Sequence, residues 1–368
     1  MSSYNICKEC NLEYTNPISK WCKPCHSKHF QNDFINWTSG NDKIDKFIQD
    51  AQLNANYNGD VLEWIPYYRF NDVKEIGRGG FGTIHYARWI DGSIEKRDIE
   101  NKDVGVEVAL KKFDNFVNFN DVLNEMEIHL KIYVEYGGSI KFYGITQDPE
   151  TYKYMIVLEY AKDGSLREYL KINFNNINWS QKLFNLWYLS YRLKTIHELD
   201  IVHQDFHPGN ILSSNFKKDI QISDFGLKVL SGDEEYTKAA DVYSFGIIAY
   251  EMVTGFPPYP DIPHIKDLAM KICNGLRPKI PFQIPKLITR MIMRCWDARV
   301  THRPTFNELS NSTTPTPLNY QTHPQEIYTS RLLNFSKLPK PKNEESFERE
   351  LEELTRSELC PSNSDLFI

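Results

Sequence analysis

The spacing of apolar positions along the chain changes near residue 166. Before it, short runs rich in branched and aromatic residues are bounded by turn signals, which is typical of β-strands. These runs cover residues 73–76, 83–87, 106–110, 140–145 and 154–160, with a helical pattern at 120–132 among them. After it, apolar residues recur every three to four positions, as do Leu183, Leu186, Leu189, Leu193 and Ile196. The pattern predicts an α+β fold in which a strand-rich lobe precedes a helical lobe.

Both ends of the chain fall outside this pattern. Residues 1–29 are rich in Cys and His, and residues 30–69 carry spaced apolar positions that predict a helical linker. Residues 311–368 are polar and contain Pro315 and Pro317, which predicts a flexible tail. One short helix in the tail would align Phe347, Leu351 and Leu354; a frayed helix is the simpler interpretation, and a partner-binding helix is the alternative. The central domain is then expected over residues 70–310, with lobes 70–160 and 161–310.

Composition narrows the class of protein. The chain has 368 residues, of which 41% are hydrophobic, so it can bury a sizeable core. A net charge of −6 argues against nucleic acid as a partner. No apolar run reaches the roughly 18 residues that cross a bilayer, and the first residues lack the pattern of a secretory signal. An odd count of seven Cys suits reduced thiols. We therefore expect a cytoplasmic protein, with the nucleus as the alternative, and no membrane partner.

A glycine-rich stretch lies between two predicted strands. It contains Gly77, Gly79 and Gly82, whose backbone can bend close to phosphate oxygens and donate amides to them. A dinucleotide site also uses spaced glycines, but it requires a helix directly after them. Residues 83–86 look extended instead, which favours a phosphate-covering loop between two strands.

Lys111 ends a predicted strand, and Glu125 lies on the predicted helix that follows. An ammonium group on a strand can neutralise phosphate charge, and it needs a carboxylate to hold it. Glu127 lies about 200° around the helix from Glu125 and points to another face. For either residue alone, a solvated surface charge is the simpler interpretation. The order of glycine loop, Lys and Glu favours an ion pair.

Two short strings carry the remaining chemistry. Residues 203–210 read His-Gln-Asp-Phe-His-Pro-Gly-Asn, and Asp224-Phe225-Gly226 begins fourteen residues after Asn210. Carboxylate and amide oxygens on tight loops suit a base for a hydroxyl group and ligands for magnesium.

Together these motifs resemble those of the eukaryotic protein kinase family over residues 70–310. Within that family the His-Pro-Gly-Asn string, residues 241–246 and Cys295-Trp296 resemble the tyrosine-kinase-like group. The resemblance implies a bilobal kinase fold with ATP and Mg²⁺ as cofactors. It also implies transfer of the γ-phosphoryl group to a protein hydroxyl in signal transduction, with Ser or Thr favoured over Tyr.

The resemblance also implies roles for individual residues. Asp205 would be the base, Asn210 and Asp224 would hold magnesium, Lys111 and Glu125 would pair, and Asp241 would support the catalytic loop. The Glu159 carbonyl and the Ala161 amide would bind the adenine edge. Four apolar residues would sandwich the purine: Ile76, Ile84, Ala109 and Leu212.

Two features depart from the family pattern. Gln204 stands where the family has an Arg that binds a phosphorylated activation loop. Only nine residues separate Gly226 from Tyr236, and no Ala-Pro-Glu motif lies there. The Glu of that motif pairs with the Arg matched by Arg303, and a truly buried pair that loses one partner costs roughly 3–5 kcal/mol. A nucleotide-binding pseudokinase is therefore the alternative function, and a deleted exon or a faulty gene model would equally explain the gap.

Cys7 and Cys10 form one CxxC motif, and Cys22 and Cys25 form a second. Two such motifs at this spacing predict a structural zinc site, which would fold a segment too short to hold a core. The alternatives are a disordered reduced tail, a disulfide pair, or His26 or His29 in place of one Cys. Zinc ribbons bind protein, RNA or DNA, so a third hypothesis makes this segment the functional part and the kinase fold a scaffold.

Overall fold

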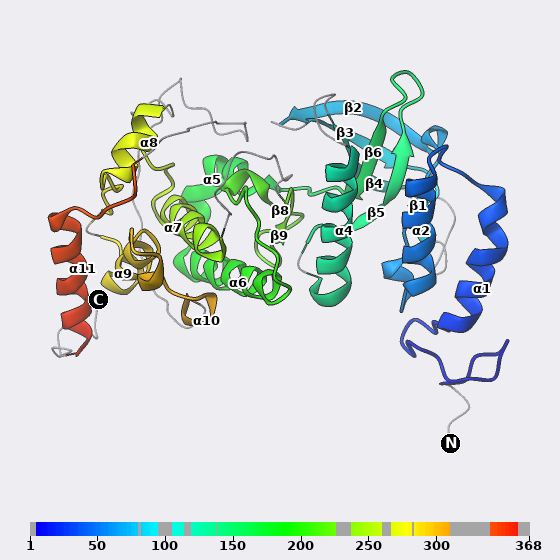
Figure 1. Cartoon of the computed structure of the whole chain (residues 1–368), viewed down its shortest axis with the longest axis horizontal. Helices are drawn as coiled ribbons and strands as arrows, with labels where there is room; N and C mark the ends of the chain where they lie inside the picture. Colours follow the sequence, from blue (N-terminus) through cyan, green and yellow to red (C-terminus); the bar gives the residue numbers. More distant parts are fainter. Residues whose placement is uncertain are drawn as a thin grey trace. The chain divides into compact units, whose positions relative to one another are not determined.

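The computed structural model describes residues 5–79, 82–94, 105–113, 119–137, 139–225, 237–259, 266–281, 283–309 and 339–359. The chain divides into two compact units, Met1–Tyr160 and Ala161–Ile368, and each is described by itself (Figure 1). Gly226, Tyr236 and Cys360 lie outside the described residues. Among the described helices, none combines the length and apolarity that crossing a bilayer requires.

A six-stranded sheet forms the centre of the first unit. Its strands lie in the order β1-β5-β6-β4-β3-β2, and β1 runs parallel to β5 while the other neighbours are antiparallel. The strands are β1 (Glu63–Trp64), β2 (Phe70–Arg78), β3 (Gly82–Trp89), β4 (Val106–Phe113), β5 (Phe142–Gln147) and β6 (Tyr154–Glu159). The five strands expected from the sequence are β2 to β6. The sixth, β1, comes from the region expected to be a helical linker.

Side chains along β4 alternate between two faces of the sheet. One face packs into the core, and the other carries residues expected to bind the nucleotide. Val108 and Leu110 are fully buried in one apolar cluster with Trp89 and Val157. Because successive side chains in a strand point to opposite faces, Lys111 projects from the other face. Its neighbour across the ladder on β3 is Ile84, and Ala109 lies two residues back along the same face.

Helices α1 (Lys23–Asp33), α2 (Asp42–Asn54) and α4 (Phe119–Tyr136) belong to the same unit, with 3₁₀ turns at Phe34–Asn36, Asn58–Asp60 and Tyr67–Arg69. Figure 1 shows α1 alongside α2. The Asn41 side chain caps α2 by accepting a hydrogen bond from the Lys43 amide. Ile44, Ile48 and Gln52, each four residues apart, form the buried stripe of α2. The region 30–69 is thus partly helical, as expected, but it also joins the sheet.

Helices dominate the second unit, which also contains a three-stranded sheet in the order β7-β8-β9. The α+β class predicted from the sequence is confirmed. The elements are β7 (Gly164–Ser165), α5 (Leu166–Asn173), α6 (Trp179–Glu198), β8 (Ile211–Ser213), β9 (Gln221–Ile222), α7 (Lys238–Thr254), α8 (Lys266–Cys273), α9 (Lys286–Cys295), α10 (Phe306–Leu309) and α11 (Glu345–Leu359), with 3₁₀ turns at Phe174–Asn176, Pro208–Asn210 and Val300–His302.

Residues 345–359 of the expected flexible tail form helix α11, the short helix that the spacing of Phe347, Leu351 and Leu354 allows. It packs against α9 within the second unit (Figure 1). Phe347 is buried and lies under the Arg277 guanidinium, 5.6 Å from the ring centre. The Asn343 side chain, just before the helix, donates a hydrogen bond of 2.9 Å to Asp297. One aromatic anchor and several polar contacts, among them Arg299 with Glu348, thus order this segment, although its composition is polar.

Candidate active site

Lys111 and Glu125 form a buried ion pair in the first unit. Lys111 Nζ lies 2.5 Å from Glu125 Oε1, which joins strand β4 to helix α4. The two residues are only 4% and 1% exposed. The ammonium also lies 5.0 Å from the centre of the Phe113 ring. The structure thus brings together the two residues that the sequence pairs, in surroundings where water screens their charges weakly.

His129, which the sequence analysis did not single out, lies beside this pair. It is one turn along α4 from Glu125 and is also 1% exposed. Its Nε2 is 3.7 Å from Glu125 Oε1. The four-residue spacing of Glu125 and His129 on a helix is the signal that could have revealed this neighbour.

The glycines between β2 and β3 are of two kinds. A side chain at Gly82 would meet the Lys112 carbonyl oxygen at 2.1 Å, so packing of β3 on β4 requires glycine there. Gly77 and Gly79 have nothing within 4 Å of an added Cβ, and the Gly79 amide donates to the Gly82 carbonyl at 2.9 Å. Gly80 and Phe81 lie outside the described residues. Gly77 and Gly79 are therefore the glycines beside open space that a ligand can occupy.

The apolar residues expected around a purine divide between the two units. Ile76 is exposed, and Ile84 and Ala109 are half-buried, on neighbouring strands of the first unit. Leu212, in β8 of the second unit, is partly buried and pairs with Ser165 and Gln221. Glu159 ends β6 opposite Val108, and Ala161 begins the second unit.

In the second unit, the loop before β8 holds Asp205 next to Asn210. The Asn210 Nδ2 atom donates to the Asp205 main-chain oxygen at 2.9 Å and to its Oδ2 at 3.3 Å. His207 Nδ1 accepts from the Gly209 amide at 2.9 Å. In neutral His207 the proton is then on Nε2, which lies 3.7 Å from Asp205 Oδ1. Both carboxylate oxygens of Asp205 are thus next to a nitrogen that can donate.

Strand β9 places Asp224 near this loop. Ser223, its neighbour in the chain, donates its amide and its hydroxyl to the Asn210 carbonyl oxygen at 2.9 and 3.3 Å. Asp224 has a φ of 55° in the left-handed region, which non-glycine residues adopt rarely. Such a conformation persists where surrounding contacts impose it, and it is common at functional sites.

Asp241 supports the same loop from helix α7. Its Oδ2 accepts the His203 amide at 2.8 Å and lies 2.9 Å from His197 Nε2. The His203 ring is fully buried, lies 3.0 Å through Nε2 from the Ser223 carbonyl oxygen, and packs on Phe225. Burial lowers the pKa of His203, so the ring is neutral and Nε2 donates to that carbonyl.

The Arg303 guanidinium donates to main-chain carbonyl oxygens. Its Nε donates to the Asp297 carbonyl oxygen at 2.8 Å, and its NH1 donates to the Ala239 carbonyl oxygen at 2.7 Å. The guanidinium also lies 5.3 Å from the centre of the Tyr243 ring. The sequence lacks the Glu that pairs with this Arg in related kinases. In the structure, two main-chain oxygens and the Tyr243 ring contact the guanidinium instead.

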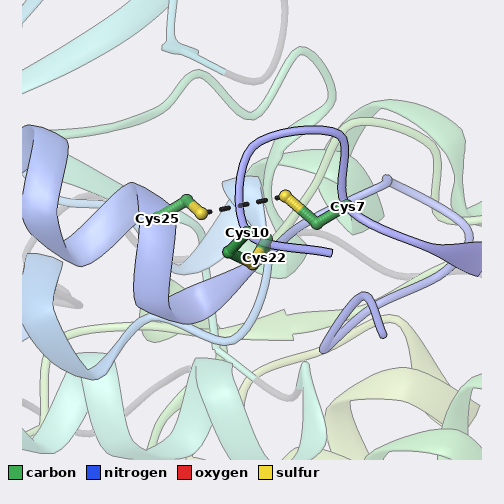
Figure 2. Close-up of side chains that lie close together, drawn as sticks. All are labelled: Cys7, Cys10, Cys22 and Cys25. Atoms are coloured by element: carbon green, nitrogen blue, oxygen red, sulfur yellow. Dashed lines mark hydrogen bonds between the residues drawn. The ribbon is translucent and has the colours of Figure 1, made fainter. Parts of the chain in front are cut away.

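The four amino-terminal cysteines converge, as Figure 2 shows. All four Sγ atoms lie within 4.8 Å of one another, with 3.7 Å between Cys7 and Cys25 and 3.4 Å between Cys10 and Cys22. Four thiolates at the usual zinc–sulfur length of about 2.3 Å stand about 3.8 Å apart around a tetrahedron. The donor set and its spacing therefore fit a tetrahedral metal.

The surroundings of the thiols bear on whether His26 or His29 replaces one of the four cysteines. The backbone amides of Cys10 and Glu9 lower the pKa of Cys7 to about 7, whereas burial raises the pKa of Cys22 and of Cys25. His26 Nδ1 lies 2.8 Å from the Cys22 carbonyl oxygen, and His29 Nε2 lies 2.8 Å from Glu9. Both histidines are thus engaged elsewhere, and the four cysteines make up the cluster.

Comparison with known families identifies the central part of the chain. Residues 70–236 and 229–313 match the family model described as protein tyrosine and serine/threonine kinase. The two matched stretches overlap at residues 229–236.

Three relatives illustrate the range of similar proteins. Tyrosine-protein kinase SPK-1 of Girardia tigrina is 29% identical over 268 residues, which cover 64% of this chain and 50% of that protein. Putative serine/threonine-protein kinase/receptor R831 of Acanthamoeba polyphaga mimivirus is 28% identical, with coverage of 75% and 17%. Dual specificity protein kinase pyk3 of Dictyostelium discoideum is 26% identical, with coverage of 76% and 21%. The chain spans at most half the length of these relatives.

Proposed function

Because the chain belongs to the protein tyrosine and serine/threonine kinase family, we propose that it transfers the γ-phosphoryl group of ATP to a hydroxyl group of a protein. The observation that carries this proposal is the buried pair of Lys111 and Glu125 at 2.5 Å. A buried pair costs desolvation energy, and this one has the partners and position of a phosphate-binding ammonium. A decayed pseudokinase has no need to retain it.

In this proposal Lys111 binds the α- and β-phosphates, and Glu125 holds the ammonium in place. Gly77 and Gly79 leave open space in which the phosphates can approach the backbone. The adenine edge pairs with the Glu159 carbonyl and the Ala161 amide. The purine ring is sandwiched by the apolar set Ile76, Ile84, Ala109 and Leu212.

Asp205 is the proposed base. It accepts the proton of the substrate hydroxyl while that oxygen bonds to the γ-phosphorus and the bond to the β-phosphate oxygen breaks, which releases ADP. Asn210 and His207 hold its carboxylate through the contacts at 3.3 and 3.7 Å. Asn210 and Asp224 supply oxygens of the hard type that magnesium prefers, and bound magnesium would neutralise phosphate charge.

Ser and Thr are the proposed acceptors, within intracellular signalling in the cytoplasm. The His-Pro-Gly-Asn string supports this assignment through its resemblance to the tyrosine-kinase-like group. The relatives carry tyrosine, serine/threonine and dual-specificity names, so the acceptor needs its own measurement. Phosphoamino-acid analysis of a labelled generic substrate separates the three outcomes.

The test of the activity is transfer of labelled γ-phosphate by the purified full chain with magnesium-ATP. Asp205→Asn is expected to lower the rate by at least about 100-fold, because it removes general-base catalysis. Asp267→Asn, at an exposed acidic residue of α8, is the matched control and leaves the rate unchanged. Absence of transfer in the parent chain, with a melting temperature still raised by magnesium-ATP, would identify a nucleotide-binding pseudokinase instead.

We further propose that Cys7, Cys10, Cys22 and Cys25 hold one structural zinc ion. The convergence of four sulfur atoms within 4.8 Å supports this assignment, and a four-thiolate site fits a reducing compartment. Elemental analysis of the purified chain should find one zinc per chain. Cys22→Ser should lose it, whereas Cys273→Ser, outside the cluster, should keep it. Zinc below about 0.2 per chain after purification in added zinc would refute the site.

A further inference from the structure

The Cys-rich segment, residues 5–33, contacts the lobe that carries Lys111. Trp21 directly precedes Cys22 and is only 2% exposed. Its indole Nε1 donates to the Ala55 carbonyl oxygen at 3.1 Å, and its ring is buried with Ala55 and Val61. Ile94, beyond β3, packs against the same cluster. A cysteine of the thiol cluster and the residue that docks the segment are thus neighbours in the chain.

Polar contacts from α1 reinforce this anchor at the end of α2. Lys23 Nζ donates to the Asn54 carbonyl oxygen at 2.9 Å, and Ser27 Oγ donates to the Leu53 carbonyl oxygen at 3.1 Å. The last carbonyls of a helix have no partner within the helix, and a cation there also interacts favourably with the helix dipole. The Cys-rich segment therefore supplies the carboxyl-terminal cap of α2.

Helix α2 and the chain after it are bound to the sheet. Gln52 Nε2 donates to the Leu62 carbonyl oxygen at 2.7 Å, and β1 pairs with β5 directly afterwards. Gly144 of β5 approaches so closely that an added Cβ would lie 1.9 Å from the Glu63 carbonyl oxygen. Phe47 of α2 stacks on Phe142 of β5, with 6.4 Å between ring centres.

The same region reaches α4, the helix that carries Glu125. Lys43 Nζ, in the first turn of α2, donates to Asn120 Oδ1 at 3.1 Å near the start of α4. The 3₁₀ turn Asn58–Asp60 contacts α4 as well. Between these contacts lies a groove of about 630 Å³ lined by α2 and α4. The chain from α2 to β1 therefore contacts α4 through Lys43 and through the turn Asn58–Asp60, which lie on either side of this groove.

We propose that the Cys-rich segment binds the chain's own amino-terminal lobe, and that metal held by its thiols thereby stabilises α4 and the Lys111–Glu125 pair. The inference deepens the proposed zinc site by assigning it a partner. The Cys-rich segment, residues 5–33, contains four Lys and three acidic residues, a balance that lacks the positive charge of a nucleic-acid-binding surface. Because metal binding and folding of a small segment are one equilibrium, metal affinity is transmitted to whatever the folded segment contacts.

The test uses the full chain with Trp21→Ala, which removes the anchor and keeps all four cysteines. The matched control is Ile35→Ala, at an apolar residue near the same segment that is 90% exposed. Hydrogen exchange measured by mass spectrometry should be at least about tenfold faster in β1 and α4 of the Trp21 variant and unchanged in the control. Affinity for a fluorescent magnesium-ATP analogue should fall by about fivefold or more in parallel.

Zinc content measured on the same samples shows whether a change in hydrogen exchange comes from loss of the Trp21 contact or from loss of the metal. Unchanged exchange in α4 of a Trp21→Ala chain that keeps its zinc would overturn the proposal. If Trp21→Ala loses zinc or fails to fold, the double variant Lys23→Met with Ser27→Ala takes its place, since it removes the contacts to the end of α2 and to Asn56 just beyond it. Faster exchange in α4 is expected there too, and unchanged exchange overturns the proposal. Exchange and nucleotide affinity do not require phosphotransfer, so a chain without kinase activity leaves this test intact.

Discussion

His129 Nε2 lies 3.7 Å from the same Glu125 oxygen that binds Lys111. Among the described residues, the second oxygen of Glu125 has no hydrogen-bond partner. A buried carboxylate with a single strong partner is poorly restrained, and a nearby ring N–H limits the positions it can adopt. We therefore expect His129 to act as a positioning residue for the Lys111–Glu125 ion pair.

Replacement of His129 by Leu should weaken binding of a magnesium-ATP analogue and lower kcat/KM by about tenfold, because it removes the polar ring that lies 3.7 Å from the buried carboxylate and limits its positions. His129→Gln keeps an N–H donor and should retain most of the activity. Titration of a fluorescent ATP analogue and initial-rate kinetics check both variants. Equal losses in the Leu and Gln variants would show that ring packing is the role of His129.

A double-mutant cycle makes this test sharper. In a Glu125→Gln background, His129→Leu should change nucleotide affinity much less than it does in the parent chain, because the carboxylate that it positions is gone. Full additivity of the two effects would contradict direct coupling between the residues.

Activity should not depend on phosphorylation of the chain. Gln204 is neutral, so it cannot pair with a phosphate as the Arg of related kinases does. Treatment with a phosphatase should leave the initial rate within about twofold, and Gln204→Arg should not raise it. A rate that falls severalfold after dephosphorylation, with a phosphosite mapped by mass spectrometry, would show that a Lys or Arg at another position binds the phosphate.

Arg303→Lys should lower the free energy of unfolding by about 2–4 kcal/mol. Lysine cannot donate to the Asp297 and Ala239 carbonyls at once, and one buried acceptor is left without its charged donor. Urea denaturation measures the change. Arg294→Lys, whose contact with Glu308 is a single exposed one at 3.5 Å, is the control and should change stability by less than about 0.5 kcal/mol.

Lys182→Met should stabilise the chain at neutral pH by up to about 3 kcal/mol. Burial lowers the pKa of Lys182 to about 8, and its ammonium lies 3.5 Å from the Val253 carbonyl oxygen and over the Phe174 ring. Below pH 8 the folded state carries the full cost of this buried charge. Between pH 8 and the ordinary lysine pKa of about 10.4, the unfolded state binds more protons, so stability rises with pH.

Urea denaturation at several pH values tests this directly. The rise in stability above pH 8 should be smaller in Lys182→Met than in the parent chain. The control is Lys171→Met in α5, because Lys171 is more than half exposed and pairs with Glu168 on the same helix. A destabilised Lys182→Met variant would show that contacts with the aromatic rings outweigh the cost of burial.

Local pattern accounts for much of the fold. Strands β2 to β6 and helices α4 and α6 follow from runs and spacings that are visible in the sequence, because strand and helix periodicities differ. The pairing of Lys111 with Glu125 also follows, since their order along the chain matches a known arrangement. The short helix α11 is also visible in the spacing of Phe347, Leu351 and Leu354, but its packing on α9 through the buried Phe347 is not.

The amino-acid sequence by itself determined the α+β class, the order of the chemical motifs and the four cysteines of the amino-terminal cluster. These features depend on residue type and on separation along the chain. Only the tertiary structure decided that β1 joins the sheet, that Trp21 docks on Ala55, and that carbonyl oxygens bind Arg303. Such contacts join residues far apart in sequence, and main-chain acceptors are the same at every position, so no local pattern distinguishes them.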